Sequence, residues 1–177
     1  ELCLNGAEVT MLQRSSSTVV SIEPSSARAT TLYKDNHDRW SIDDLDLRGA
    51  STPFDLTRRM SVPLSKWMAE EDKELLDGLR SIGFRLDNGE DDTGFYMKLI
   101  RKLSGYYINV GASDLLIEGK IKLRHGEVVG LTEDKAILSD GGEIQVDMVV
   151  FGTGWKPLTD AVAALFGKEV AERIGPI

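Results

Sequence analysis

The sequence lacks several features that would place a protein outside the cell or in a membrane. Cys3 is the only cysteine among 177 residues, so the chain cannot form an internal disulfide bond. It has no run of about 18 consecutive apolar residues that would predict a membrane span, and no signal-peptide pattern. We therefore expect an intracellular protein with a cytoplasmic location.

Positive charge is also scarce. The chain has 21 Lys and Arg against 29 Asp and Glu, which gives a net charge of −8. Nucleic acids and anionic membranes bind basic faces, so we expect neither as a partner. Any phosphate recognition must then depend on a local group of cations. With 41% hydrophobic residues, the chain is still able to bury the core of about one domain.

The stretch from Glu143 to Pro157 holds the strongest motif. Met148 to Phe151 is a continuous apolar run, typical of a strand buried on both faces of a largely parallel sheet. The run ends at Gly152, Thr153 and Gly154, where glycines let the backbone turn and let a flat ligand approach closely. Ligands of open α/β sheets bind just beyond the carboxyl ends of strands. We therefore predict that these three residues contact a cofactor, the alternative being a plain glycine turn.

Three segments resemble the flavin-containing monooxygenases, especially their indole-pyruvate-oxidising branches. They are VVFGTGWKP from Val149 to Pro157, GAEVTMLQRSS from Gly6 to Ser16, and GYYINVGASDLLIEGKIKL from Gly105 to Leu123. In that family, an apolar strand followed by (A/G)TG(Y/W) leads from the NADPH domain back to the FAD domain. Gly152 departs from the family, which usually has alanine there. The segments occur in the family's order, so the resemblance implies a domain of an enzyme that uses FAD and NADPH.

The first residues read as the end of a helix followed by a strand. Glu1 to Asn5 predicts a last helical turn that Gly6 stops, and Glu8 to Gln13 predicts a strand. A dinucleotide-binding unit has a strand and a GxGxxG turn just before such a helix. Since the sequence contains no GxGxxG, we expect a fragment of a longer protein, cut after the glycine fingerprint of its NADPH domain.

The residues after this strand predict the choice of cofactor. An acidic residue at this position would bind the ribose hydroxyls of NAD and repel the additional phosphate of NADP. The chain instead has Gln13, Arg14, Ser15 and Ser16. Arg14 offers a planar, permanently charged donor for a phosphate, and the serine hydroxyls add neutral hydrogen bonds. We predict that these four residues bind NADPH, the alternative being an exposed arginine in a polar loop.

Helical periodicity is clearest from Pro63 to about Ser81, because a proline suits a first turn and apolar residues recur on one side. A second helix is predicted from Phe95 to Leu103, and a short one that Ser113 would cap. Near the end of the chain, Thr159 is predicted to cap a helix from Asp160 to Phe166.

The remaining segments predict strands and loops. Tyr106 to Gly111 is extended, with its adjacent tyrosines on opposite faces. Closely spaced short strands over 121–145, beginning with Ile121 to Leu123, predict an antiparallel meander. Ser21 to Ser26 reads as a loop, and residues 18–62 as an irregular insertion. No motif predicts a metal site.

Together these patterns predict an α/β fold, a Rossmann-like NAD(P)-binding domain with a mainly parallel sheet and an inserted antiparallel β-meander, truncated at the N-terminus. Residues 1–157 would be a partial NADPH-binding domain, and 158–177 the start of the return to the FAD-binding domain. The resemblance implies an FAD-dependent, NADPH-using monooxygenase that inserts one oxygen atom of O₂ into a small organic substrate. The fragment alone would be inactive. The residues assign no catalytic side chain, substrate or oligomeric state.

Two other classes of protein stay open. A pyridine-nucleotide:disulfide oxidoreductase shares the architecture but needs two thiols, and this chain has one. A non-catalytic nucleotide-binding or interaction module could keep the same fold.

Overall fold

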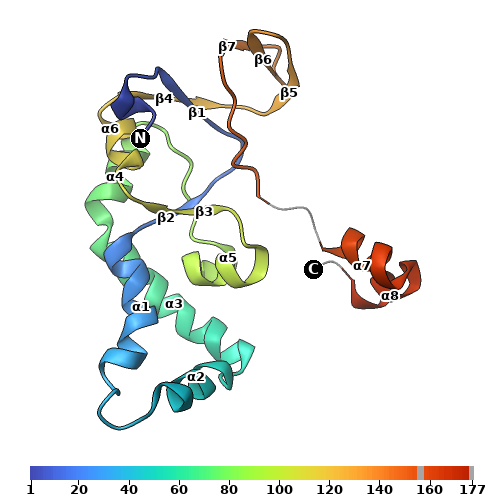
Figure 1. Cartoon of the computed structure of the whole chain (residues 1–177). Coiled ribbons are helices and arrows are strands. Elements are labelled where there is room, and N and C mark those ends of the chain that lie inside the picture. Colours follow the sequence, from blue (N-terminus) through green and yellow to red (C-terminus); the bar gives the residue numbers. More distant parts are fainter. Residues whose placement is uncertain (155–157, 176–177) are drawn as a thin grey trace.

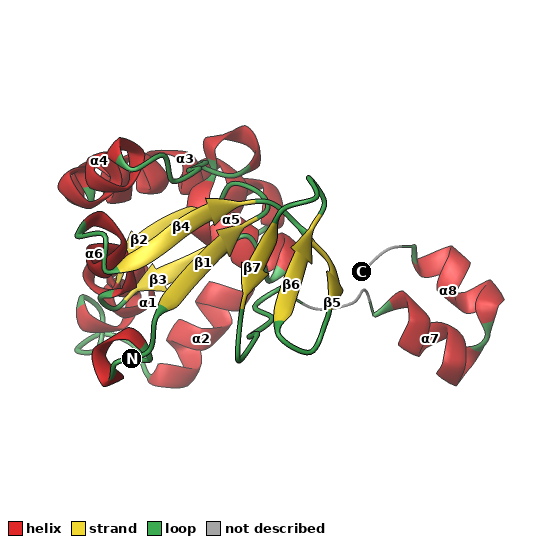
Figure 2. Cartoon of the chain, turned by 90° about the horizontal axis from the view of Figure 1, so that it is seen from above, coloured by secondary structure: helices red, strands yellow, loops and turns green. Residues whose placement is uncertain are grey.

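The chain has a mixed α/β fold, as the sequence predicts (Figures 1 and 2). The computed structural model describes residues 1–154 and 158–175, apart from the side chains of 27–29. In chain order the elements are η1 (Cys3–Asn5), β1 (Val9–Gln13), β2 (Thr18–Ser21), α1 (Ile22–Lys34), α2 (Ile42–Ala50), α3 (Phe54–Glu71), α4 (Lys73–Ser81), η2 (Glu90–Asp92), α5 (Gly94–Lys102), β3 (Tyr106–Asn109), α6 (Ala112–Ile117), β4 (Ile121–His125), β5 (Val128–Leu131), β6 (Lys135–Leu138), β7 (Glu143–Gln145), α7 (Thr159–Phe166) and α8 (Lys168–Ile174).

The strands of the described residues form three small sheets. β1 pairs with β4 and β2 pairs with β3, both in parallel, whereas β5, β6 and β7 form an antiparallel sheet. Figure 1 shows the β1–β4 pair above the β2–β3 pair, and the antiparallel sheet of β5, β6 and β7 at the upper right. Parallel pairing requires crossover connections, and helices α1 to α5 and α6 supply them. The parallel strands are thus divided into pairs, where the sequence predicts one mainly parallel sheet.

The predicted meander is wrong at its first strand, β4. The sequence assigns Ile121 to Leu123 to antiparallel pairing, but β4 runs parallel to β1, with Val9 opposite Ile121 and Met11 opposite Leu123. All four side chains belong to one hydrophobic cluster. Burying them together favours this long-range pairing over a local hairpin. The meander prediction is confirmed for β5, β6 and β7 only.

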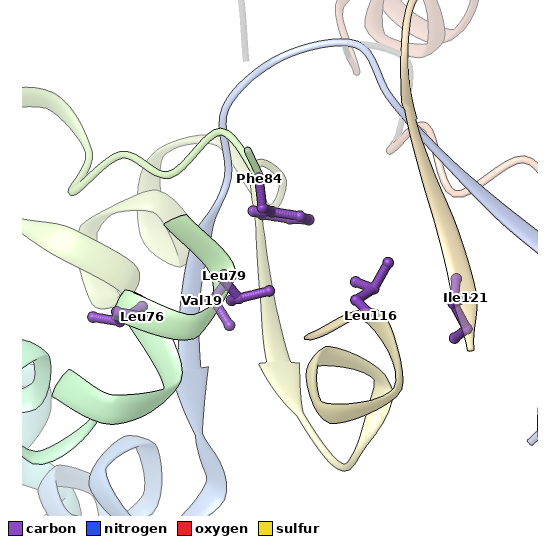
Figure 3. Close-up of a cluster of buried hydrophobic side chains, with 6 residues drawn as sticks. All are labelled: Val19, Leu76, Leu79, Phe84, Leu116 and Ile121. Atoms are coloured by element: carbon purple, nitrogen blue, oxygen red, sulfur yellow. The ribbon is translucent and has the colours of Figure 1, made fainter. Parts of the chain in front are cut away.

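One hydrophobic cluster joins the two parallel pairs to the helices that cover them. Its buried members are Val19, Leu76, Leu79, Phe84, Leu116 and Ile121 (Figure 3). Leu76 and Leu79 come from α4 and Leu116 from α6. These two helices therefore hold β2 and β4 within one core.

The adjacent tyrosines of β3 pack on opposite faces of the strand, as predicted. Tyr107 meets Phe84 edge to face, with ring centroids 6.2 Å apart, beside the cluster just described. Tyr106 meets Phe95 edge to face at 4.9 Å in a second cluster with Val20. Both tyrosines therefore serve packing.

The predicted helix from Pro63 to Ser81 is wrong at its start and in its continuity. α3 begins at Phe54 and runs through Pro63. A proline removes one backbone donor, and a helix of 18 residues keeps enough other bonds to continue. The helix is then interrupted at Asp72, between α3 and α4. The buried carboxylate of Asp72 accepts hydrogen bonds from the hydroxyl of Ser21 and, at 2.8 Å, from the N–H of Ser21. This contact ties the break to the end of β2.

Residues 18–62 are regular, not irregular as predicted. They contain β2, α1, α2 and the first turns of α3. In the predicted loop from Ser21 to Ser26, Ser21 ends β2 and the other residues begin α1. α2 begins with a capping box, in which the Ser41 hydroxyl and the Asp44 carboxylate each bind the other residue's backbone N–H.

The predicted strand from Met148 to Phe151 does not form. The chain after β7 has no regular structure up to residue 154, and the side chains of Met148, Val150 and Phe151 are all more than half exposed. Apolar residues of this kind form a buried strand only when a partner strand and covering layers are present. No described strand pairs with this segment.

Two predicted caps are also wrong. α6 is capped by Asn109, whose Oδ1 accepts hydrogen bonds from the N–H groups of Gly111 and Ser113. Ser113 is instead fully buried, with its hydroxyl 2.7 Å from that of Tyr107. At α7, Thr159 makes no cap and its Oγ1 is buried without a partner among the described residues, although the helix covers the predicted range.

The last two helices, α7 and α8, lie apart from the rest of the chain and pack against each other (Figure 1). α8 and this pairing have no counterpart in the sequence prediction. Among the described helices, none combines the length and the apolar composition that a membrane span needs.

Candidate functional site

The predicted NADPH-binding residues follow β1, at the carboxyl end of a parallel strand pair. β1 ends at Gln13, opposite His125 at the end of β4. Arg14, Ser15 and Ser16 then lead to β2. The segment therefore occupies the kind of position at which ligands of parallel α/β sheets bind.

Gln13 anchors this segment. Its side chain is buried, with 6% of the residue exposed. The amide Nε2 donates to the Arg85 carbonyl, and the amide Oε1 accepts from the Arg85 N–H, both at 2.8 Å. Both polar atoms of the Gln13 side chain thus bind the backbone of Arg85, and the amide is not free to bind a ribose.

Arg14 is exposed and weakly held. Its side chain is 65% exposed, and Nη1 lies 3.3 Å from Oε1 of Glu127, the residue directly before β5. An exposed ion pair of this kind contributes about 0–1 kcal/mol to stability. A doubly charged phosphate could therefore displace Glu127 at little cost.

The two serines differ in their surroundings. Ser15 is exposed, whereas Ser16 is half-buried and lies close enough to Asp87 to help lower the pKa of that carboxyl group. Asp87 also binds the Lys98 ammonium at 2.5 Å and accepts from the Gly89 N–H at 2.7 Å. Through Asp87, the end of the Arg14 segment is fixed to the loop before η2.

These contacts set the pKa of Asp87. Partial burial by itself raises the pKa, but hydrogen bonds from Lys98, Gly89 and Ser16 outweigh burial and hold it below the ordinary value of 3.8. The folded state thus favours the charged form. That contribution to stability is present above the unfolded pKa and is lost as the pH falls through the folded pKa.

We predict that Asp87→Asn flattens the acid side of the stability profile. In the native chain, the free energy of unfolding should decline as the pH falls below about 4, partly because Asp87 takes up a proton. The variant has no proton to take up at this site, so its decline should be smaller. Urea denaturation at several pH values between 7 and 3 measures the difference. An unchanged slope would show that Asp87 does not contribute to acid sensitivity.

The second predicted contact segment, Gly152 to Gly154, is exposed irregular chain. Gly154 has φ 83°, a left-handed conformation that favours glycine, and a Cβ there would lie 3.3 Å from Ser104 Cβ. Ser104 precedes Gly105, whose carbonyl accepts from the N–H of Thr18. The two predicted segments therefore approach the same end of the β2–β3 pair. Residues 155–157 of the motif lie outside the described residues.

The structure adds residues that sequence reasoning missed. Arg85 and Asp87 lie beside the Arg14 segment although they are about 70 positions away, and no pattern in the sequence relates them to it. The Nε2 of His125, opposite Gln13, is buried without a hydrogen-bond partner within the described part of the chain. Such a ring nitrogen can donate or accept a hydrogen bond. Residues 1–154 and 158–175 contain no group of His, Cys, Asp and Glu side chains that could hold a metal ion.

No known protein family matches the chain, and no curated protein matches it.

Proposed function

We propose that the chain is part of the NADPH-binding domain of an FAD-dependent monooxygenase, with a Rossmann-like architecture. The single observation that carries the proposal is the place of Arg14. It is an exposed guanidinium directly after the last residue of a parallel strand, flanked by Ser15, and among the described residues its partner is Glu127 in an exposed ion pair. This arrangement supports recognition of the 2′-phosphate of NADPH, because a guanidinium binds two phosphate oxygens in one plane.

The other residues have supporting roles in this proposal. Gln13 fixes the end of β1, and the hydrogen bonds that join Ser17 and Thr18 to Asp87 fix the start of β2. Gly154 offers backbone without a Cβ where a flavin could approach closely. When bound, FAD supplies the chemistry with O₂, using electrons from NADPH. The substrate would be a small organic molecule.

Arg14→Ala tests the proposal in the longer protein to which we propose the chain belongs. The substitution should raise the KM for NADPH by roughly tenfold to a hundredfold, since a charge-assisted hydrogen bond contributes about 1.5–3 kcal/mol. The KM for NADH, which lacks the phosphate, should stay almost unchanged. Steady-state oxidation of both nucleotides, together with flavin absorbance, measures these effects.

Arg39→Ala is the matched control. Arg39 is an exposed arginine in the connection between α1 and α2. Figure 1 shows this connection far from β1, so the loss of Arg39 should leave both KM values unchanged. Equal weakening of NADPH and NADH by Arg14→Ala would assign Arg14 a structural role and remove the main support for NADPH. A protein without flavin absorbance would exclude the monooxygenase.

A further inference from the structure

Arg85 has an unusual combination of a fixed backbone and an unpaired side chain. Its carbonyl accepts hydrogen bonds from Gln13 Nε2 and from the Ser17 N–H, and its own N–H donates to Gln13 Oε1. The Cα of Arg85 is therefore fixed next to the segment that carries Arg14. The backbone contacts of Arg85 thus set where its side chain begins.

The guanidinium of Arg85 reaches the same segment. Its Nη1 lies 3.5 Å from the Arg14 carbonyl oxygen. This distance exceeds that of a good N–H···O hydrogen bond, which is about 2.7–3.2 Å, so the contact locates the group and contributes little energy. The guanidinium of Arg85 thus lies against the backbone of the loop that carries Arg14.

The charges of the two arginines are unequally compensated. Arg14 forms an ion pair with Glu127. Arg85 is exposed and makes no ion pair with any residue that the structure describes. The chain as a whole is acidic, with a net charge of −8, so two arginines on adjoining backbone segments give this site a local positive charge. An anion within reach of both side chains would interact favourably with both charges.

We infer, on the basis of the proposed function, that Arg85 is a second binding residue for the 2′-phosphate of NADPH. A phosphate monoester carries up to two negative charges and several acceptor oxygens at neutral pH, which matches two guanidinium groups. Glu127 competes for the same position by pairing with Arg14, so the phosphate must displace it. Arg85 therefore determines cofactor preference, and Glu127 opposes it.

The test measures binding of adenosine 2′,5′-bisphosphate and of 5′-AMP to the chain by NMR titration. The two probes differ only in the 2′-phosphate, and the Nε–Hε signals of arginine report contact directly. The native chain should prefer the bisphosphate. Arg85→Ala should lower the affinity for the bisphosphate on the order of tenfold or more, without changing that for 5′-AMP. Arg85→Lys, which keeps the charge but loses the planar fork, should fall between the two.

Two further variants complete the design. Glu127→Gln should raise the affinity for the bisphosphate, because it frees Arg14 while leaving a side chain of the same length. Arg39→Ala removes one equally exposed positive charge elsewhere and should change neither affinity. Since the anchoring of residue 85 uses only backbone atoms, Arg85→Ala should retain the native NMR spectrum outside this loop.

The outcomes separate the inference from the function on which it rests. If the native chain prefers the bisphosphate and Arg14→Ala removes the preference while Arg85→Ala behaves like Arg39→Ala, the phosphate site stands and the role of Arg85 is refuted. If the native chain binds both probes equally, the phosphate site itself is refuted, and the role of Arg85 with it.

Discussion

Replacing Gly94 with alanine should lower the free energy of unfolding by about 2–4 kcal/mol. Gly94, at the start of α5, has φ 70°, a left-handed conformation that costs a residue with a Cβ about 1–2 kcal/mol. A Cβ at this position would also overlap Ser65 Oγ and lie 2.7 Å from Ser65 Cβ. Ser65 is buried in α3 and donates to Asn88 Oδ1 at 2.6 Å, so it cannot move aside freely.

Gly83→Ala separates the two causes. Gly83 has φ 79°, and a Cβ there would have no atom within 4 Å. Its replacement should therefore cost only the backbone strain, about 1–2 kcal/mol. Urea denaturation of both variants gives the steric contribution as a difference. Equal losses would mean that Ser65 yields without cost.

Gln13→Glu should lower the free energy of unfolding by about 2–4 kcal/mol at neutral pH. The substitution keeps the length of the side chain but removes the donor that binds the Arg85 carbonyl. It also places a negative charge in a buried position, facing that oxygen. Burial raises the pKa of such a carboxyl group. The loss should therefore shrink as the pH falls below about 5, where the protonated acid is again a donor.

Gln145→Glu makes the same substitution on an exposed strand. Gln145, in β7, donates to Asp134 Oδ2 at 2.9 Å. A carboxylate there meets another carboxylate in water, so the loss should stay below about 1 kcal/mol. Chemical denaturation compares the two variants. If Gln13→Glu destabilises the chain no more than Gln145→Glu, the amide of Gln13 does not anchor the loop.

Local signals in the sequence predicted much of the secondary structure. β1 and α5 lie within a residue or so of their predicted ranges. Gly6 ends η1 with φ 90°, as a stop signal of this type requires. These features depend on neighbouring residues alone. The capping box at Ser41 was an equally local signal that the prediction of an irregular segment overlooked.

Pairing partners were less predictable. β4 has the short spacing of a hairpin strand, and only the burial of its apolar face against β1 decides for the parallel partner. Met148 to Phe151 has the composition of a buried strand, but composition does not provide a partner strand. Sequence patterns of this kind predict that a segment can form an extended strand. Which strand it pairs with depends on the rest of the molecule.

In the candidate site, too, the local features could be predicted from the sequence and the long-range contacts could not. Arg14 could be identified because its position after a strand is a property of the local sequence. Arg85 could not, because a contact between two loops leaves no periodicity. Gln13 was assigned to the cofactor on its neighbourhood in the sequence, and only its two hydrogen bonds with the Arg85 backbone reveal an anchoring role.

The uncovered segment at Met148, Val150 and Phe151 has a consequence for the chain in solution. These strongly apolar, strand-forming side chains are each more than half exposed, and the backbone beside them belongs to no sheet. Segments with high β-propensity, low charge and free backbone groups add readily to one another across separate molecules. Concentrated samples of the chain should therefore be limited by self-association through this segment, even where the folded core is intact.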